Sequence, residues 1–538
     1  MSRVEPWWRT ATVYQVYIRS FKDGNGDGTG DIAGLCSKLP YLRDLGVDAV
    51  WINPWYPSPL LDGGYDVADY RNIDPRFGDI DEAVEFIALA KNHGIRVLVD
   101  LVPNHTSWEH AWFRAALEAG PGSPERRRYH FRPGSGPDGS KPPNDWSAVF
   151  GGSAWEQVPD GEWYLHLFDI SQPDLNWEHP DVRHEFDSIL RFWLDRGVSG
   201  FRVDVAHSLV KAPGYPDVGD EANEERLLTE GRLSRHPYWD RPELHDIVRS
   251  WRATLDRYPD AMMVAEAWVS DLERLAHYLR PDEYHQAFDF DFLQAAWDPD
   301  QMRAAIDDSM AAVGSVGSIP TWVLSNHDVV RHATRYGLPI DVDAKAWLLD
   351  GDRSLLDPAL GERRARAAAL LLLALPGSVY IYQGEELGLP EVTELPTDVL
   401  EDPVWVRSEN SEKGRDGCRV PIPWTVDGDS AGFGADGSWL PQPAGWGERS
   451  VEAQSGATGS MLELYRSALR LRRERLASDL DMEWEEGSNG GLVFRRGSGL
   501  RCVVNFGPAP LAIEGEVLLS SVELSDGLLP PDAAVWLD

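Results

Sequence analysis

Cysteine is scarce in this sequence. Its 538 residues include three cysteines, Cys36, Cys418 and Cys502. They lie far apart, form no pair at the spacing of a metal site and leave one thiol over from any disulfide, which indicates a reducing compartment. Long apolar runs are also missing, because the longest, AAALLLLAL at 367–375, is far shorter than a membrane span. These absences exclude a disulfide scaffold and a membrane-spanning chain.

Positive charge is in deficit. Lys and Arg number 51 against 88 Asp and Glu, so the formal net charge is −37 at pH 7. Such a chain repels phosphate backbones and anionic membrane surfaces, which makes nucleic acid and membranes poor partners and favours a neutral substrate. The start, MSRVEPWWRTATVYQV, lacks the basic and apolar segments of a signal peptide. We therefore expect a cytoplasmic, soluble protein, either a monomer or a homodimer.

Apolar and aromatic residues are plentiful, at 42% and 10% of the chain, enough for a large core and more than one domain. Short β-rich segments alternate with amphipathic helix patterns. Eight strands are predicted, at 11–19, 48–54, 95–105, 200–206, 262–268, 286–292, 321–328 and 378–386. Eight alternating pairs with apolar strands predict an α/β fold, a closed (β/α)₈ TIM barrel. The alternative, an open doubly wound sheet, is disfavoured because no GxGxxG turn is present.

Helix signals lie between the strands. The pattern predicts one helix over 31–46, with Asp31 as its N-cap and Gly46 as its stop, and further helices over 79–94 and 179–197. Later helices are expected to begin near Pro242, Asp271, Pro299, Gly361 and Ser460.

Two loop-rich stretches and a change of pattern near residue 481 divide the chain. Residues 104–178 are too long for an ordinary connection after the third strand and predict an inserted domain. We expect residues 1–103 and 179–480 to form the barrel, with a loop-rich insertion at about 388–445. From 481 to 538 short strands and turns predict a C-terminal antiparallel β-sandwich domain.

Polar residues recur at the carboxyl ends of the predicted strands, which converge over one mouth of a barrel. They are Asp100, Asn104, His105, Arg202, Asp204, Glu266, His327 and Asp328. Three of the acids, Asp204, Glu266 and Asp328, should meet there. Two carboxyl groups in different environments are what glycoside hydrolysis needs, one ionised and one protonated. A zinc cluster is the rival explanation, but no HExxH spacing is present.

The ordered motifs resemble the α-amylase superfamily of glycoside hydrolases, family 13, and within it the α-glucosidase and oligo-1,6-glucosidase branch. The resemblance spans nearly the whole chain. It is carried by DLVPNH (100–105), QPDLN (172–176), GFRVDVAHS (200–208), EAW (266–268) and SNHD (325–328), with GGYDV (63–67), YQGEELG (382–388) and GRDGCRVPIPW (414–424).

The resemblance implies roles for the three acids. Asp204 matches the nucleophile that forms a β-glucosyl-enzyme, Glu266 the general acid and later the base, and Asp328 the acid that holds sugar hydroxyls. Arg202 would keep Asp204 ionised, because a nearby cation favours the carboxylate. Further substrate contacts are implied for Tyr65, Asp66, His105, Phe150, Phe168, His327 and Arg415, with Asp66 and Arg415 closing the far end of the pocket.

One further motif, DGNGDGTGD at 23–31, matches the first nine positions of an EF-hand loop but lacks the glutamate at position twelve. It resembles the calcium- or magnesium-binding loop of the oligo-1,6-glucosidase branch. A structural Ca²⁺ or Mg²⁺ ion is therefore expected and no organic cofactor. Its ligands would be Asp23, Asn25, Asp27, Thr29 and Asp31.

The resemblance implies a retaining exo-α-glucosidase that releases α-glucose from maltose, short maltooligosaccharides or sucrose. Val205, directly after the nucleophile, goes with α-1,6 preference in part of this branch, so an oligo-1,6-glucosidase acting on isomaltose is the alternative. A transglucosylase or sucrose isomerase would differ only in what attacks the intermediate. A non-catalytic relative, like the amino-acid transporter heavy chains, is disfavoured because Asp204, Glu266 and Asp328 are all retained.

Overall fold

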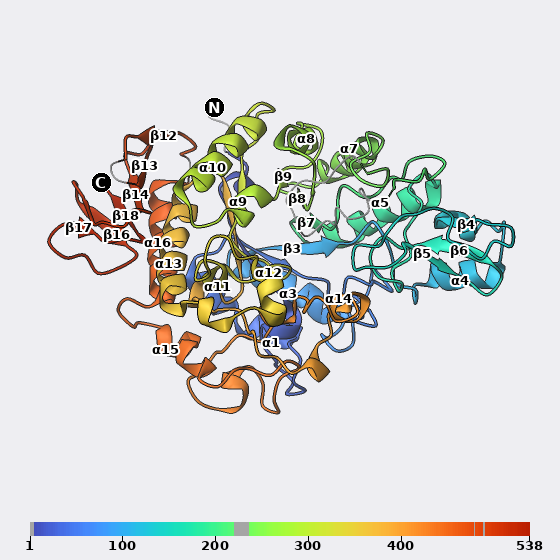
Figure 1. Cartoon of the computed structure of the whole chain (residues 1–538), viewed down its shortest axis with the longest axis horizontal. Helices are drawn as coiled ribbons and strands as arrows, with labels where there is room; N and C mark the ends of the chain where they lie inside the picture. Colours follow the sequence, from blue (N-terminus) through green and yellow to red (C-terminus); the bar gives the residue numbers. More distant parts are fainter. Residues whose placement is uncertain (1–4, 220–235, 478, 488–489) are drawn as a thin grey trace.

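Eight parallel strands form the centre of the molecule (Figure 1). The computed structural model describes residues 5–219, 236–477, 479–487 and 490–538. Around the sheet the strands follow the order β10-β11-β1-β2-β3-β7-β8-β9. Their bounds are β1 Thr12–Val16, β2 Ala49–Ile52, β3 Arg96–Leu101, β7 Gly200–Val203, β8 Met262–Ala265, β9 Gln286–Ala287, β10 Thr321–Val323 and β11 Ser378–Tyr382.

All eight predicted strands are present, which confirms the barrel. Nearly every strand residue is buried, as expected for parallel strands covered on both faces. The ring is nearly closed: β9 and β10 are not paired as a ladder, but the Asp289 N–H donates to the Thr321 carbonyl at 3.2 Å. Register matters for the site, because it pairs Asp100 on β3 with Arg202 on β7.

Helices cover the barrel, and the predicted helix over 31–46 is wrong as a single element. It divides at Lys38 into two, because Pro40 has no N–H to donate and fits only the first turn of a helix. The Asp31 cap and the left-handed Gly46 stop are both present. The helices between barrel strands are α1 Ile32–Ser37, α2 Leu39–Leu45, α3 Ile80–Asn92, α5 Pro180–Leu194, α7 Leu244–Leu255, α8 Leu272–Tyr278, α9 Phe290–Gln294, α10 Pro299–Gly314, α11 His332–Arg335, α12 Ala344–Asp350 and α13 Pro358–Ala374.

Short helices and one long helix follow the last barrel strand. They are α14 Pro403–Arg407, α15 Val451–Gln454 and α16 Met461–Arg475. Within the residues that the structure describes, no helix is long and apolar enough to cross a membrane.

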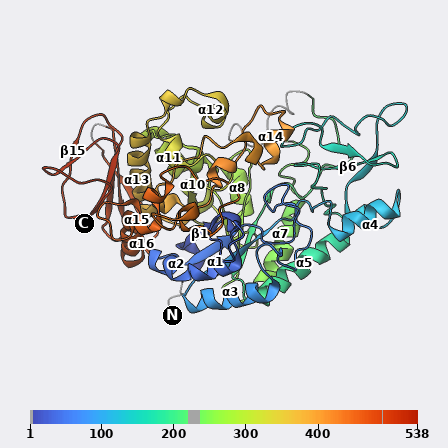
Figure 2. The same ribbon diagram turned by 90° about the horizontal axis from the view of Figure 1, so that it is seen from below.

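The segment after β3 forms a small domain of its own. A three-stranded antiparallel sheet in the order β4-β6-β5 packs beside α4, Ala111–Ala119. The strands are β4 Phe131–Pro133, β5 Trp155–Gln157 and β6 Glu162–Leu165. It lies at one end of the long axis, and the C-terminal sheet lies at the other (Figures 1 and 2).

The C-terminal residues form an antiparallel five-stranded sheet, β12-β13-β14-β18-β16, and a two-stranded sheet, β15-β17. Strand β18 packs against α13, and the Trp536 indole N–H donates to the Leu370 carbonyl of that helix at 3.0 Å. The strands are β12 Met482–Glu485, β13 Gly491–Arg496, β14 Arg501–Asn505, β15 Leu511–Ala512, β16 Val517–Ser520, β17 Leu528–Leu529 and β18 Ala533–Leu537.

A buried ammonium group ties the inserted domain to the barrel. Lys211 Nζ lies 2.8 Å from Asp174 in the inserted domain and donates to the Asn104 side chain at 2.7 Å and to the Ser208 carbonyl. Both partners of the ion pair are buried. The pair therefore holds together the three segments that follow β3, leave the inserted domain and follow β7.

We expect Lys211→Met to reduce the free energy of unfolding by about 3 to 5 kcal/mol, because Asp174 would be left as an unpaired buried charge. Denaturant unfolding measures the change. The exposed Lys91→Met is the control, expected within about 0.5 kcal/mol of wild type. The double variant Lys211→Met/Asp174→Asn should recover part of the loss, and wild-type stability of Lys211→Met would contradict the assignment.

Candidate active site

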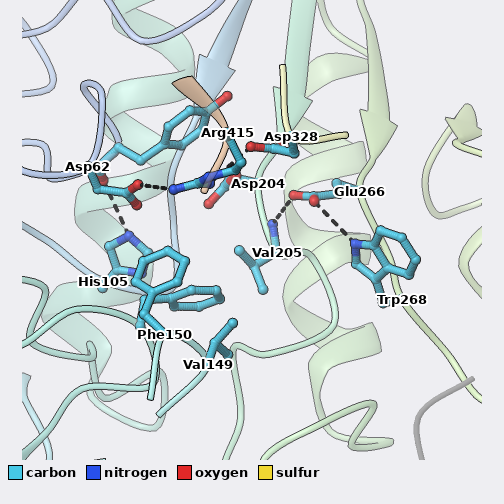
Figure 3. A pocket seen from close by; sticks show the side chains of 12 residues that line it. Asp62, His105, Val149, Phe150, Asp204, Val205, Glu266, Trp268, Asp328 and Arg415 are labelled. Atoms are coloured by element: carbon cyan, nitrogen blue, oxygen red, sulfur yellow. Dashed lines mark hydrogen bonds and ion pairs between the residues drawn. The ribbon is translucent and has the colours of Figure 1, made fainter. Parts of the chain in front are cut away.

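A cavity opens at the carboxyl ends of the barrel strands (Figure 3). Its volume is about 530 Å³ including the open mouth, within the range of small-molecule sites. Loops after five barrel strands and the inserted domain supply the walls. The lining residues are Asp62, Tyr65, His105, Val149, Phe150, Phe168, Asp204, Val205, Glu266, Trp268, Asp328 and Arg415.

One buried guanidinium organises the acids at the base of this cavity. Arg202 Nη1 lies 2.8 Å from Asp100 and 2.5 Å from Asp204, and its Nη2 lies 2.7 Å from Glu266. Its side chain is 2% exposed. Because both nitrogens belong to one planar group, Asp204 and Glu266 are held side by side, and each has an oxygen left for a ligand.

Burial raises the pKa of the Asp204 carboxyl, and the negative charges of Glu266 and Asp100 raise it further, while the Arg202 guanidinium opposes them. Burial likewise raises the pKa of Asp100 to about 6, against the charge and hydrogen bonds of Arg202. A single positive charge thus faces three carboxyl groups in a space of low polarity. Protonation of one member of the cluster is favoured, which is the state that acid and nucleophile together require.

Asp328 has the opposite environment. Its carboxylate accepts from Arg415 at 3.0 Å and Arg419 at 3.1 Å, and His327 Nε2 lies 3.3 Å away. Burial would raise the pKa of Asp328, but His327 and the two guanidinium groups outweigh it and hold the pKa below its usual range. Asp328 is therefore a permanently charged wall of the cavity.

The far end of the cavity is closed by an ion pair between Arg415 and Asp62 at 2.8 Å (Figure 3). Arg415 also contacts Asp402 at 2.6 Å, so three carboxylates fix its position. The guanidinium lies over the ring of Phe150, 5.1 Å from its centre. These contacts fix the Arg415 guanidinium in the wall of the cavity.

A family model for the catalytic domain of alpha-amylase matches residues 15–479, which hold the barrel, the inserted domain and every lining residue. The chain belongs to the α-amylase family of glycoside hydrolases. A second model, a domain of unknown function designated DUF3459, matches residues 487–536.

Curated relatives and a solved structure cover nearly the whole hydrolase. A probable alpha-glucosidase of Rhizobium meliloti (strain 1021) is 37% identical over 515 residues, 93% of this chain and 89% of its own. An oligo-1,6-glucosidase of Parageobacillus thermoglucosidasius is 35% identical, over 88% of this chain and 84% of its own. The crystal structure of an alpha-glucosyl transfer enzyme, XgtA, superimposes with a TM-score of 0.86 at 33% identity over 99% of each chain.

The expected role of Asp66 in closing the pocket of this hydrolase is wrong. Asp66 is fully buried away from the cavity, where its carboxylate accepts from the Ser58 hydroxyl and the N–H groups of Leu61 and Asp62. Burial raises its pKa to about 7. Asp62, four residues earlier, pairs with Arg415 instead. The motif region contains two aspartates, and only the turn from Asp62 to Tyr65 decides which one faces the cavity.

The other expected contact residues gather at the site in two layers. Tyr65, His105, Phe150 and Phe168 line the cavity. His327 lies behind, stacked on Tyr65 with ring centres 5.3 Å apart, and its Nδ1 contacts Gln15. Burial lowers the pKa of His105 to about 4, so its imidazole is neutral and can donate to a sugar hydroxyl. Their substrate contacts stay predictions.

Four lining residues, Asp62, Val149, Val205 and Trp268, were not predicted as site residues from the sequence, and the last two contact Glu266. Trp268 donates its indole N–H to Glu266 Oε1 at 3.3 Å, and the Val205 N–H donates to Glu266 Oε2 at 3.1 Å (Figure 3). Trp268 ends the EAW motif, so its place two residues after Glu266 was a usable signal. The contact between the Val205 N–H and Glu266 gave no signal in the sequence, because it is made by the main chain.

The 23–31 loop folds on itself through its side chains. The two oxygens of Asp23 accept from the N–H groups of Gly26 and Gly28, and Asp31 accepts from three backbone N–H groups as the cap of α1. Across the described ranges, no group of three or more His, Cys, Asp or Glu side chains is arranged to bind a metal ion. The loop thus offers oxygen donors but no preformed carboxylate cluster, and the ion stays a prediction.

We expect the activity of this hydrolase to fall with acidity from a pH well above the usual carboxyl pKa of about 4, because the raised pKa of Asp204 lets this carboxylate take up a proton at a higher pH than an ordinary aspartate does. A protonated Asp204 cannot act as a nucleophile, whereas Asp328 stays ionised throughout. The measurement is kcat/KM against pH, with circular dichroism as the control for folding. Full activity at pH 4 would contradict the raised pKa.

Proposed function

We propose that this enzyme is a retaining, exo-acting α-glucosidase that releases α-glucose from the non-reducing end of short α-glucosides. The observation that supports this most directly is the cavity, in which Asp204 and Glu266 contact one guanidinium and the Arg415–Asp62 ion pair forms part of the wall. A retaining glycosidase needs its two carboxyl groups about 5 to 5.5 Å apart, which contact with one guanidinium favours.

In the first step, Asp204 attacks the anomeric carbon of the terminal glucose. The bond to the glycosidic oxygen breaks, and Glu266 gives that oxygen its proton, so the rest of the substrate leaves as an alcohol. A β-glucosyl ester on Asp204 results. Arg202 contacts both carboxyl groups and so stabilises the negative charge as it passes from Asp204 to Glu266.

In the second step, the ionised Glu266 removes a proton from water, and the water oxygen attacks the anomeric carbon from the side that the alcohol left. The ester bond breaks, Asp204 regains its charge and α-glucose is released. Two inversions give net retention. Asp328 contributes a fixed negative charge close to the developing positive charge on the sugar ring and accepts hydroxyl hydrogen bonds.

Exo action follows from the ion pair at the far end. We infer that the Arg415–Asp62 pair stops a sugar chain after one residue, and that both side chains offer hydrogen-bonding groups to the last hydroxyls of a glucose. Stacking surfaces from Tyr65 and Phe168 suit the apolar faces of a pyranose.

We propose maltose, short maltooligosaccharides or sucrose as substrates. The relatives include a probable alpha-glucosidase, an oligo-1,6-glucosidase and an alpha-glucosyl transfer enzyme, so isomaltose hydrolysis and glucosyl transfer are the competing outcomes. Val205 favours the 1,6 outcome if the branch rule applies here.

We expect glucose to be released fastest from maltose or maltotriose in a panel with isomaltose, sucrose and trehalose, and NMR of the first turnovers to show the α-anomer. Asp204→Ala should lose at least a factor of about 1000 in kcat, and azide should rescue it with β-glucosyl azide as product, because azide attacks in place of the carboxylate. A first product of β-glucose would overturn retention. Preference for isomaltose would replace the 1,4 assignment.

We also propose that the 23–31 loop binds a structural Ca²⁺ or Mg²⁺ ion, supported by the side-chain oxygens of Asp23, Asn25, Asp27 and Asp31 and the main-chain carbonyl of Thr29. EDTA should then lower Tm in metal-free buffer, by mass action, and added Ca²⁺ should restore it. Asp27→Ala, at an exposed position, should abolish the EDTA effect, while Asp138→Ala at an exposed loop elsewhere should keep it. A wild-type Tm that EDTA leaves unchanged would refute the ion.

A further inference from the structure

The backbone at Val205 adopts a conformation that its side chain disfavours. Its φ is +41°, in the left-handed region, where a β-branched residue is an outlier. The surrounding hydrogen bonds hold it there: the Ala206 N–H donates to the Glu266 carbonyl at 2.8 Å, and the Val205 carbonyl accepts from the Ser208 N–H at 3.1 Å. Such strain persists only where neighbouring contacts enforce it, and it gathers at functional sites.

This conformation aims the Val205 N–H at the side chain of Glu266. The N–H donates to Oε2 at 3.1 Å, and Arg202 Nη2 donates to the same oxygen at 2.7 Å. Oε1 has only the longer contact from the Trp268 indole, at 3.3 Å. The two oxygens therefore differ: Oε2 faces two fixed donors, whereas Oε1 retains room for a proton and for the sugar.

We propose that Val205 is a positioning residue whose left-handed backbone holds Oε2 of Glu266, so that Oε1 is the oxygen that transfers the proton. The N–H stabilises the charge that appears on Glu266 as the glycosidic oxygen is protonated. This inference rests on the proposed function, because it requires Glu266 to be the general acid.

The charged groups that face Glu266 are few. Arg202 and Asp204 reach it from β7, and Asp328 lies on another wall of the cavity. Trp268 and the buried, neutral His207 also lie beside it. None of these groups changes when one backbone N–H is removed, so a shift in the pH profile reports on the hydrogen bond itself.

The test replaces the Val205 amide by an ester, with α-hydroxyisovaleric acid introduced in place of valine, so that the side chain stays and the N–H goes. We expect the alkaline limb of kcat/KM to move up by about one pH unit, because the ionised carboxylate loses a donor. We expect maltose turnover to fall about tenfold and turnover of α-glucosyl fluoride, which needs no proton, to fall less than about twofold.

The matched control is an ester at Phe288, whose buried N–H donates to the main-chain carbonyl of Ala265 and takes no part in holding Val205 or Glu266. It removes a neighbouring buried hydrogen bond, and its alkaline limb should stay at the wild-type pH. Val205→Ala keeps the N–H and should also keep the limb in place. Circular dichroism confirms that each protein is folded.

An unmoved limb in the Val205 ester would overturn the proposal, and so would an equal shift in the Phe288 ester or an equal loss with α-glucosyl fluoride. Glu266→Gln separates this failure from that of the proposed function. If Glu266 is the acid, the variant loses the alkaline limb and still releases a burst of fluoride from α-glucosyl fluoride, because formation of the glucosyl-enzyme from that substrate needs no proton; if it keeps the limb, the assignment of the acid has failed.

Discussion

The active site depends on one guanidinium shared by three carboxyl groups. Arg202 is buried where a lone charge would be strongly destabilising, and it is stable there because Asp100, Asp204 and Glu266 surround it. The arrangement is unbalanced, with more negative charge than one cation neutralises; burial raises the pKa of Asp204, and the charges of Glu266 and Asp100 raise it further. A lysine could not replace Arg202, because a lysine has one ammonium nitrogen and cannot donate to these carboxyl groups from two nitrogens of one planar group. The same imbalance explains why Asp328 needs its own cations, Arg415 and Arg419.

Barrel register and long-range anchors bring these groups together. The pairing of Asp100 with Arg202 on adjacent strands places the first ion pair without any loop. The walls are less local, because Arg415 comes from beyond the last barrel strand and Phe150 from the inserted domain. Lys211 fixes that domain through Asp174. The base of the site is thus built from the sheet. Its specificity comes from loops, which separate contacts hold in place.

Much of this could be predicted from the sequence. All eight strands were found, because parallel strands buried on both faces appear as short apolar runs, and the acids at their ends follow from the shared topology. The choice between Asp62 and Asp66 could not be made, since both flank the same glycines and a single turn decides which one faces the cavity. The division of the first helix could be predicted only by giving Pro40 more weight than the continuous apolar pattern around it. The Val205 contact was invisible, because a main-chain N–H carries no residue identity.

The packing of β18 on α13 has a consequence for the order in which the chain folds. Ten residues of α13 are buried, and part of their cover comes from the C-terminal sheet, including the Trp536 indole that reaches the Leu370 carbonyl. During synthesis on the ribosome this apolar helix emerges more than 150 residues before Trp536 does. Until then this part of the helix surface lacks its final cover, so the barrel reaches its finished packing only after the terminal sheet has been synthesised.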